Sequence, residues 1–405
     1  MSTIIELVQN GSVTSPKGFL AGGTYAGLKS EGDNVLDLGI LVSESLANVG
    51  ATFSTNSVLS PSVTVSKERS RKKMCRGVVA NSGCANCAVG EQGFKDALEL
   101  ASLAADVAGV EPDEMLVCST GMIGVEMPMA LIRQNIGNVR PNTNDGDRFA
   151  QSIMTTDSHP KYLAISVDIG GRKITLGGAA KGVGMVHPNM ATMLAFISTD
   201  ASVEQEFLQN SLGEAVSTSF NMIDIDGDQS TNDTVLIFAN GAAGGPMIEQ
   251  GTHEGSIFQE ALTYICTFLA KELVRDGEGA KKLIHITVDG AKSLPDARKA
   301  SREIASSLLV KAMVHGNDPN WGRIMMALGK SGIQLEESKI DIFINNIQIV
   351  HAGLAIPYHQ DAVVSSMRKP DVYFKVSLNI GDYEATGWGC DLTEEYVIFN
   401  SAYST

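Results

Sequence analysis

The chain has 405 residues and a formal net charge of −15, from 31 basic and 46 acidic side chains. A chain of this length buries a large core and exceeds the usual size of one domain, so we expect two lobes. Hydrophobic residues make up 43% and charged residues 19%, which excludes a disordered chain. Nucleic-acid binding is disfavoured, because proteins of that class present a basic surface.

The sequence also lacks the usual signals for a membrane or an oxidising compartment. No apolar run reaches the roughly 18 residues of a membrane span. The first residues lack the basic and apolar regions of a secretory signal. The six cysteines do not form the dense pattern of a disulfide framework. We therefore expect no membrane partner and a location in reducing cytoplasm.

The first 190 residues alternate β-rich runs with Ala-rich helical ones. Residues 94–107 carry apolar side chains at helical spacing and predict an amphipathic helix. Strands are predicted where apolar or alternating runs end in turn-forming residues. The predicted strands are 76–80 (ending in a turn at 81–83), 115–118 (ending in a turn at 119–121), and the hairpin 163–169 with 173–176.

The pattern starts again after residue 192. Helices are predicted over 203–220, 258–276 and 297–309, and strands over 234–239 and 283–289. Two hairpins are predicted, one pairing 340–344 with 348–350 and one pairing 372–378 with 384–387. Because hairpins and helices are mixed in this way, we expect an α+β fold with packed, layered sheets and outer helices.

One junction has the composition of a self-cleavage site. Residues 181–201 read KGVGMVHPNMATMLAFISTDA, so a glycine-rich turn precedes the pair Ala191-Thr192 and an apolar run follows it. A threonine hydroxyl needs a base, and cleavage before Thr192 would supply the threonine's own α-amine, with a pKa of about 7.7–8.0. On spacing alone, a glycine turn that leads into an ordinary buried strand is the favoured interpretation of the segment.

The chain resembles the ornithine acetyltransferase family, the glutamate N-acetyltransferases of arginine biosynthesis. The resemblance starts from the 181–201 segment and extends from about Gly11 to the last residue. It includes further segments in family order: NSGCAN at 81–86, CSTGMIG at 118–124, IMTTD at 153–157, DPNWGR at 318–323 and NSAYST at 400–405.

The resemblance implies a fold, a processing step and a reaction. The fold is the layered, N-terminal-nucleophile-like type shared with related aminopeptidases. The chain cuts itself between Ala191 and Thr192, giving an alpha fragment (1–191) with the oxyanion turn and a substrate-binding lysine, and a beta fragment (192–405) that begins with the nucleophile Thr192 and holds the C-terminal lobe. Thr192 then takes the acetyl group of N2-acetyl-L-ornithine and passes it to L-glutamate, by a ping-pong mechanism. Two alpha and two beta fragments assemble.

The resemblance also assigns site residues that composition alone does not. Thr120 and Gly121 would be the oxyanion donors, where the unaided sequence indicates a simple turn after a strand. Thr155, Lys181, Glu278, Asn400 and Thr405 would bind substrate together with Thr192. Without the resemblance, Lys181 would be a solvated turn lysine. Thr155 would be an ordinary helix N-cap and Glu278 a charged turn.

Several other signals do not develop into sites. Cys84 and Cys87 have metal-ligand spacing but no second pair, so we expect no metal. The acidic loop 224–233 starts like a calcium loop, yet Gln229 stands where that loop requires glycine. His187 lies five residues before Thr192, but the free α-amine makes a Thr-His dyad unnecessary.

Two other functions remain compatible with the residues. An N-terminal-threonine amidase or aminopeptidase would use the same nucleophile and release the acyl group to water. A non-catalytic small-molecule binding protein would keep the fold and stay uncut. No cofactor is expected, and the sequence leaves open whether acetyl-CoA is a second acetyl donor, which would make the enzyme bifunctional.

Overall fold

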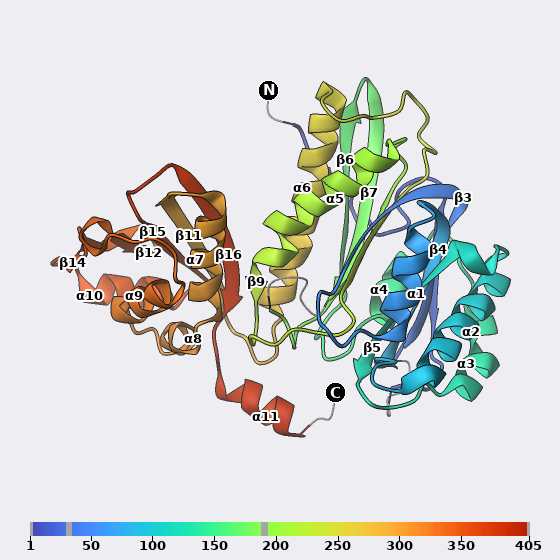
Figure 1. Ribbon diagram of the computed structural model, residues 1–405, viewed down its shortest axis with the longest axis horizontal. Coiled ribbons are helices and arrows are strands. Elements are labelled where there is room, and N and C mark those ends of the chain that lie inside the picture. The colour runs from blue at the N-terminus through green and yellow to red at the C-terminus, as the bar shows by residue number, and fades with distance from the viewer. Residues whose placement is uncertain (1–2, 30–34, 188–192, 403–405) are drawn as a thin grey trace.

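A computed structural model describes residues 3–29, 35–187 and 193–402. The chain forms a larger lobe around a nine-stranded sheet and a smaller lobe around a seven-stranded sheet, and the two lie side by side (Figure 1). The predicted cleavage position falls within the sequence of the larger lobe and not at the boundary between the lobes. The expected layered α+β architecture is confirmed.

The large sheet has the strand order β1-β6-β7-β8-β10-β3-β4-β5, and β2 pairs with β3. Its strands come from both sides of residue 192. The strands are β1 (Glu6–Leu7), β2 (Phe19–Thr24), β3 (Leu38–Phe53), β4 (Met74–Cys84), β5 (Met115–Met122), β6 (Lys161–Ile169), β7 (Arg172–Lys181), β8 (Leu194–Thr199) and β10 (Thr234–Ala239).

Helices cover both faces of this sheet, and strand β10 shows why. All six of its residues are buried, and successive side chains point to opposite faces. Val235 and Ile237 belong to the core formed with α5 and α6, whereas Leu236 and Phe238 pack in the core that contains Phe149 of α4. The helices of this lobe are α1 (Pro61–Ser70), α2 (Gly90–Ala108), α3 (Met129–Asn135), α4 (Gly146–Ser152), α5 (Gln205–Thr218) and α6 (His253–Arg275).

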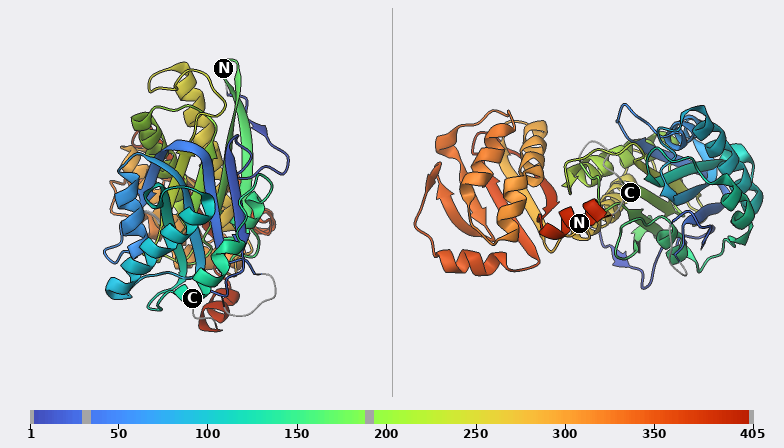
Figure 2. Two further views of the ribbon diagram at one scale, coloured as in Figure 1. Left: turned by 90° about the vertical axis from the view of Figure 1, so that its right-hand side faces the viewer. Right: turned by 90° about the horizontal axis from the view of Figure 1, so that it is seen from below.

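The small sheet has the order β14-β13-β12-β15-β11-β16-β9. Apolar residues of β11 pack against α7 in a separate core, and Figure 2 shows this lobe from below. Its elements are β9 (Ile223–Asp224), β11 (Leu283–Ala291), β12 (Asp341–Ile344), β13 (Ile347–His351), β14 (Leu354–Ala355), β15 (Asp371–Ser377), β16 (Tyr383–Cys390), α7 (Leu294–Ser306), α8 (Leu308–His315), α9 (Trp321–Lys330) and α10 (Gln360–Met367).

The last described helix, α11 (Glu394–Ala402), buries none of its own residues and lies below the two lobes in the view of Figure 1. Short 3₁₀ helices lie at Pro112–Glu114, Ile136–Asn138, Phe220–Met222 and Glu337–Lys339. Within the described ranges, none of the helices has the length and apolarity that a membrane crossing requires.

Most of the predicted elements are present. The strand predicted over 234–239 matches β10 residue for residue, and the helices predicted over 94–107, 203–220 and 258–276 correspond to α2, α5 and α6. The helix predicted over 297–309 is wrong at its end. Ser307 leaves the helical conformation and its hydroxyl caps a new helix by accepting from the Val310 amide, so the segment divides into α7 and α8.

Three local predictions are wrong because of pairing between distant segments. The residues predicted as turns at 81–83 and 119–121 continue β4 and β5, since the two strands pair in parallel through this region. The hairpin predicted from 372–378 and 384–387 does not form. The two strands it would join, β15 and β16, lie on opposite sides of β11, which pairs with both.

The strands around the predicted cleavage position interlock. β8 and β10 follow residue 192 in sequence, yet β8 pairs with β7 and β10 pairs with β3, both of which precede it. The alpha and beta fragments would therefore share one continuous sheet. Breaking the chain at residue 191 would leave these backbone hydrogen bonds intact, so the two fragments should stay together.

Candidate active site

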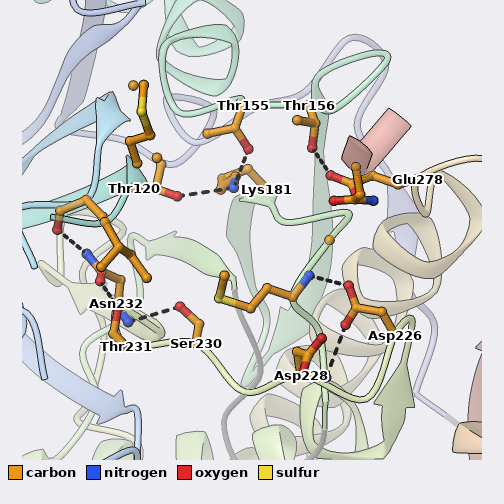
Figure 3. A pocket seen from close by; sticks show the side chains of 18 of the residues that line it. Thr120, Thr155, Thr156, Lys181, Asp226, Asp228, Ser230, Thr231, Asn232 and Glu278 are labelled. Carbon is orange, nitrogen blue, oxygen red and sulfur yellow. Dashed lines mark hydrogen bonds between the residues drawn. The ribbon is translucent and has the colours of Figure 1, made fainter. Parts of the chain in front are cut away.

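The residues that the resemblance assigned to substrate come together in one cavity. It has a volume of about 550 Å³, and it lies where the ends of β5 and β7 meet the acidic loop and α11. All six of the predicted site residues that the structure describes line this cavity: Thr120, Gly121, Thr155, Lys181, Glu278 and Asn400 (Figure 3 labels four of them).

Lys181 is the central cation of the cavity. It is the last residue of β7 and is only 2% exposed, so it is not the solvated turn lysine of the simpler interpretation. Its ammonium donates to the hydroxyls of Thr155 at 2.8 Å and Thr120 at 3.2 Å (Figure 3). Burial lowers the pKa of Lys181, and the nearby Asp157 carboxylate offsets part of that shift. The arrangement presents a charged donor to a carboxylate.

Asp157 supports Lys181 from behind. Burial alone would raise the pKa of Asp157, but Lys181 and Lys161 outweigh that effect and lower it. The Asp157 carboxylate accepts from the Lys161 ammonium at 2.8 Å and from the amide of Thr155 at 3.1 Å. Thr155 therefore lies in a loop fixed by Asp157, and it does not cap a helix. The buried carboxylate is ion-paired with Lys161 and also favours the charged form of Lys181 by its electrostatic effect.

Thr120 and Gly121 occupy the end of β5 and not a turn. The Thr120 hydroxyl oxygen accepts from Lys181, so its own hydrogen is free to be donated elsewhere. Gly121 has φ +127°, and a Cβ there would lie 2.3 Å from the backbone of Gly83. Only glycine fits this close approach of the two strands. A hydroxyl and an adjacent amide at the edge of a cavity are suitable donors to a developing oxyanion.

Glu278 forms the acidic side of the same cavity. Its carboxylate accepts from the Thr156 hydroxyl at 2.7 Å and from the Asn400 amide at 2.8 Å (Figure 3 shows the first of these). Its backbone amide donates to the carbonyl of Val183 at 2.8 Å. A Cβ on Gly184 would lie 2.5 Å from the Glu278 carboxylate, so a larger residue there would have to displace that side chain. Glu278 does lie in a turn, as the simpler interpretation has it, but its side chain is only 9% exposed.

The acidic loop 224–233 holds both sides of the predicted cleavage segment. The Asp226 carboxylate accepts from the amides of Met185 at 2.5 Å and Val186 at 2.9 Å (Figure 3 shows its bond to Met185). On the other side, the Asp233 carboxylate accepts from the Met193 amide at 3.0 Å. Burial raises the pKa of Asp233 well above its ordinary value. The carboxylates of Asp226 and Asp233 therefore bind the backbone on either side of the predicted cleavage position.

His187 belongs to the same arrangement. Its Nδ1 lies 2.8 Å from the Asp224 carboxylate, whose other oxygen lies 3.1 Å from the buried Lys311 ammonium. The imidazole is thereby fixed by the acidic loop. Asn232 connects the loop to β5, because its side-chain amide donates to the carbonyl of Ser119 at 2.7 Å. The loop thus joins the cleavage segment to the strand that carries Thr120.

Ala191, Thr192 and Thr405 lie outside the described residues, so the predicted nucleophile, cleavage position and last binding residue stay predictions. Sequence reasoning also missed several residues of the site. The missed residues are Lys29, Thr156, Asp157, Asp226, Asn232 and Tyr396. Thr156 and Asp157 lie within the family-like segment at 153–157, and the run of carboxylates at 224–233 was a usable signal. Nothing in the sequence around Lys29 or Tyr396 marks them.

Comparisons with known proteins identify the family of the chain. The family model described as the ArgJ family matches residues 20–405. The curated "Arginine biosynthesis bifunctional protein ArgJ" of Dehalococcoides mccartyi is 44% identical over the full length of both chains. Its counterpart in Symbiobacterium thermophilum is 45% identical over 98% of this chain and 99% of its own.

One solved structure extends the comparison to three dimensions. The crystal structure of the arginine biosynthesis bifunctional protein argJ from Bacillus halodurans matches with a TM-score of 0.51 and 37% identity. The match covers 51% of this chain and 98% of that chain. With a family model and relatives that match over almost the whole length, the predicted resemblance is confirmed, and the chain belongs to the ArgJ family.

Proposed function

We propose that this chain is a self-processing glutamate N-acetyltransferase that moves the acetyl group of N2-acetyl-L-ornithine to L-glutamate through Thr192. Membership of the ArgJ family makes it an acyltransferase of arginine biosynthesis. The observation that carries the proposal is that four complementary groups line one cavity. They are the ammonium of Lys181, the carboxylate of Glu278, the hydroxyl of Thr120 and the amide of Gly121. This set matches an acetylated diamino acid.

The reaction has two balanced acyl transfers. The Thr192 hydroxyl attacks the acetyl carbon of N-acetylornithine, the amide C–N bond breaks, and the hydroxyl proton passes through the Thr192 α-amine to the leaving amine. The α-amine of glutamate then attacks the acetyl ester, the bond to the Thr192 oxygen breaks, and a proton of the attacking amine passes through the Thr192 α-amine to the Thr192 oxygen. Thr120 and Gly121 donate to the oxyanion in both steps.

Lys181 and Glu278 are proposed to bind the two charged groups of the donor. The α-carboxylate of N-acetylornithine meets the ammonium of Lys181, and its δ-ammonium meets Glu278, which the Asn400 amide orients. Thr155 holds Lys181 in the productive position. Thr405 is proposed to close the cavity with Asn400 from the end of the chain.

Self-cleavage between Ala191 and Thr192 would give fragments of 191 and 214 residues (405 − 191). Two observations support it. The fragments would share one sheet, so cleavage need not separate them. About half of this chain (51%) aligns with almost all (98%) of the solved Bacillus halodurans chain. The curated relative from Dehalococcoides mccartyi instead matches over the full length of both chains. A solved chain of half length is what cleavage near the middle would produce.

The acidic loop should control how fast the chain cuts itself. Asp226→Asn replaces one acceptor oxygen with a donor that faces the amides of Met185 and Val186, and Met185 has the unfavourable φ of +56°. We expect self-cleavage to slow by about tenfold or more, since a hydrogen bond to a charged group contributes roughly 1.5–3 kcal/mol. The appearance of two bands in place of one on denaturing electrophoresis, followed over time after synthesis, measures this.

Asp391→Asn is the matched control. Asp391 also accepts from two consecutive backbone amides, those of Lys281 and Lys282, each at 2.8 Å, but away from the cleavage segment. This variant should cut at the rate of the unchanged chain. Equal cutting rates for Asp226→Asn and the unchanged chain would remove the loop from the mechanism.

Glu278 should determine how tightly the donor binds. Glu278→Gln keeps the size of the side chain but removes the charge that would meet the δ-ammonium, so the KM for N-acetylornithine should rise roughly 10- to 100-fold. Steady-state kinetics of the cut enzyme measure it. Glu395→Gln, which alters an exposed carboxylate paired with Lys281 on the same side of the protein, should leave KM unchanged. An unchanged KM in Glu278→Gln would remove Glu278 from the donor site.

Two extensions of the function stay proposals. Acetyl-CoA is proposed as a second acetyl donor, in keeping with the word bifunctional in the names of the relatives. Two cut chains are proposed to associate into an assembly of two alpha and two beta fragments, which light scattering can measure. The rival amidase or aminopeptidase activity differs in its acceptor. An assay of N-acetylornithine with and without glutamate separates the two, because an amidase releases acetate in both cases.

A further inference from the structure

The cavity contains a second lysine, Lys29, which has no role in binding the donor. Lys29 lines the same cavity as Lys181 and Thr120. Hydrogen bonds fix both its backbone and the end of its side chain. The Asp37 carboxylate accepts from the amides of Ala26, Gly27, Leu28 and Lys29, and the Lys29 ammonium donates to the carbonyl of Leu36 at 2.9 Å. A side chain held in this way is built into the site and is not a freely moving surface lysine.

The two lysines differ in how much of their donor capacity remains. An ammonium has three N–H donors. Lys181 gives two of them to Thr155 and Thr120 and lies close to Asp157. Within the described ranges, the Lys29 ammonium has one acceptor, the carbonyl of Leu36, and that acceptor is neutral. Lys29 therefore has donors and a charge available for an anion in the cavity.

The charge state of Lys29 suits that role. Burial lowers its pKa to about 8, Asp37 offsets part of the shift, and Lys181 lowers the pKa further. A pKa of about 8 keeps most of the side chain protonated at neutral pH. The electrostatic effect of Lys181 indicates that the two ammonium groups are close enough to repel. An anion that lay between or beside them would relieve this repulsion.

The two substrates of the proposed reaction differ in one feature that such a pair could recognise. N-acetylornithine carries one carboxylate and an ammonium, whereas glutamate carries two carboxylates. Lys181 can bind the α-carboxylate that both substrates have. Glu278 can bind only the side-chain ammonium of N-acetylornithine. Among the described residues that line the cavity, Lys29 and Lys181 are the cations. The second carboxylate of glutamate needs a cation, because an unpaired carboxylate in a half-buried site is costly.

We propose that Lys29 binds the side-chain carboxylate of the acetyl acceptor, and so selects a dicarboxylic amino acid for the second half of the reaction. The proposal rests on the proposed function, because it assumes that an acetyl-enzyme is discharged by glutamate. It assigns the two sides of the cavity to the two substrates: Glu278 to the cationic donor and Lys29 to the dianionic acceptor.

The test separates the two half-reactions in the cut enzyme. With N-acetylornithine alone, the appearance of acetylated beta fragment by mass spectrometry reports the first half, and its discharge by added glutamate reports the second. Discharge by ornithine, the reverse of the first half, is the internal control. The assay contains no acetyl-CoA, so no phosphate competes for Lys29. Lys29→Gln should form acetyl-enzyme and return it to ornithine at rates within about threefold of the unchanged enzyme.

Discharge of the Lys29→Gln acetyl-enzyme by glutamate should show kcat/KM lowered roughly 10- to 100-fold, as expected for loss of one charge-assisted contact. Lys29→Arg keeps the charge and should recover most of the rate. Lys282→Gln is the matched control, because Lys282 is also a half-buried lysine that donates to a backbone carbonyl, that of Val314, but outside the cavity.

The outcomes are distinguishable. The role of Lys29 would be overturned if glutamate discharged the Lys29→Gln acetyl-enzyme at the rate of the unchanged enzyme. It would also be overturned if the rates of discharge by glutamate and by ornithine fell equally. An unchanged enzyme that forms no acetylated fragment at all would instead contradict the proposed function. Selective loss of the glutamate step, rescued by arginine, is the result that supports the assignment.

Discussion

Thr192→Ala should yield a chain that stays uncut and has no measurable acetyl transfer. Alanine has no hydroxyl to attack the preceding carbonyl, so the chain keeps its full 405 residues. Without cleavage there is neither a free α-amine at residue 192 nor an acyl carrier. Loss of a nucleophile and its base together should lower kcat by a factor on the order of 10⁴ or more. Denaturing electrophoresis and an N-acetylornithine-plus-glutamate assay measure the two effects.

Thr192→Ser separates the hydroxyl from the rest of the side chain. Serine retains the attacking oxygen, so this variant should still cut and should retain a measurable fraction of the activity. A Thr192→Ala chain that is found in two pieces, or that transfers acetyl groups while intact, would show that another residue is the nucleophile.

Thr120→Ala should slow acetyl transfer by roughly 10²–10³-fold and leave the KM for N-acetylornithine nearly unchanged, because an oxyanion donor acts mainly in the transition state. The Thr120 hydroxyl accepts from the Lys181 ammonium, which polarises it as a donor. Lys181 would keep its shorter hydrogen bond to Thr155 in this variant, so the binding of the substrate carboxylate should persist. Steady-state kinetics on completely cut protein give the required separation of kcat from KM.

Thr120→Ser restores the hydroxyl and should recover most of the rate. The Thr120→Ala chain should still cut itself, because the carbonyl of residue 191 need not occupy the same oxyanion site during self-cleavage. Wild-type kcat in properly cut Thr120→Ala would mean that the oxyanion donors lie elsewhere, first among the backbone amides of 181–184.

The site residues could be predicted only because the chain resembles a family. From the residues alone, Lys181 and Glu278 look like exposed charges at glycine-containing turns. Their burial depends on neighbours distant in sequence: Glu278 contacts Thr156 and Asn400, each 122 residues away. Lys29 had no family assignment and no local pattern, so only the folded chain brings it to the cavity.

The fold shows the same division between local and distant effects. Strand β10 and helix α2 were predicted because their apolar periodicity is contained in one segment. The continuation of β5 through Thr120 and Gly121 could not be predicted, because it depends on parallel pairing with β4. The supposed hairpin of β15 and β16 failed for the same reason, since β11, from far earlier in the chain, lies between them.

The acidic loop 224–233 is informative although its sequence departs from that of a calcium loop. The sequence excluded calcium binding from the position of one missing glycine. The cluster of carboxylates nevertheless has a structural partner, the backbone on both sides of the cleavage segment. Buried carboxylates need hydrogen-bond donors, and here backbone amides supply them.

The central claim, that Thr192 carries the acetyl group at a new N-terminus, is tested most directly by mass spectrometry of the purified protein after brief exposure to N-acetylornithine. The account predicts two polypeptides, of which the larger begins TMLAF and gains the mass of one acetyl group, located by fragmentation on its first residue and lost when glutamate is added. A single polypeptide of 405 residues that is active, or an acetyl group on any other residue, would contradict the account.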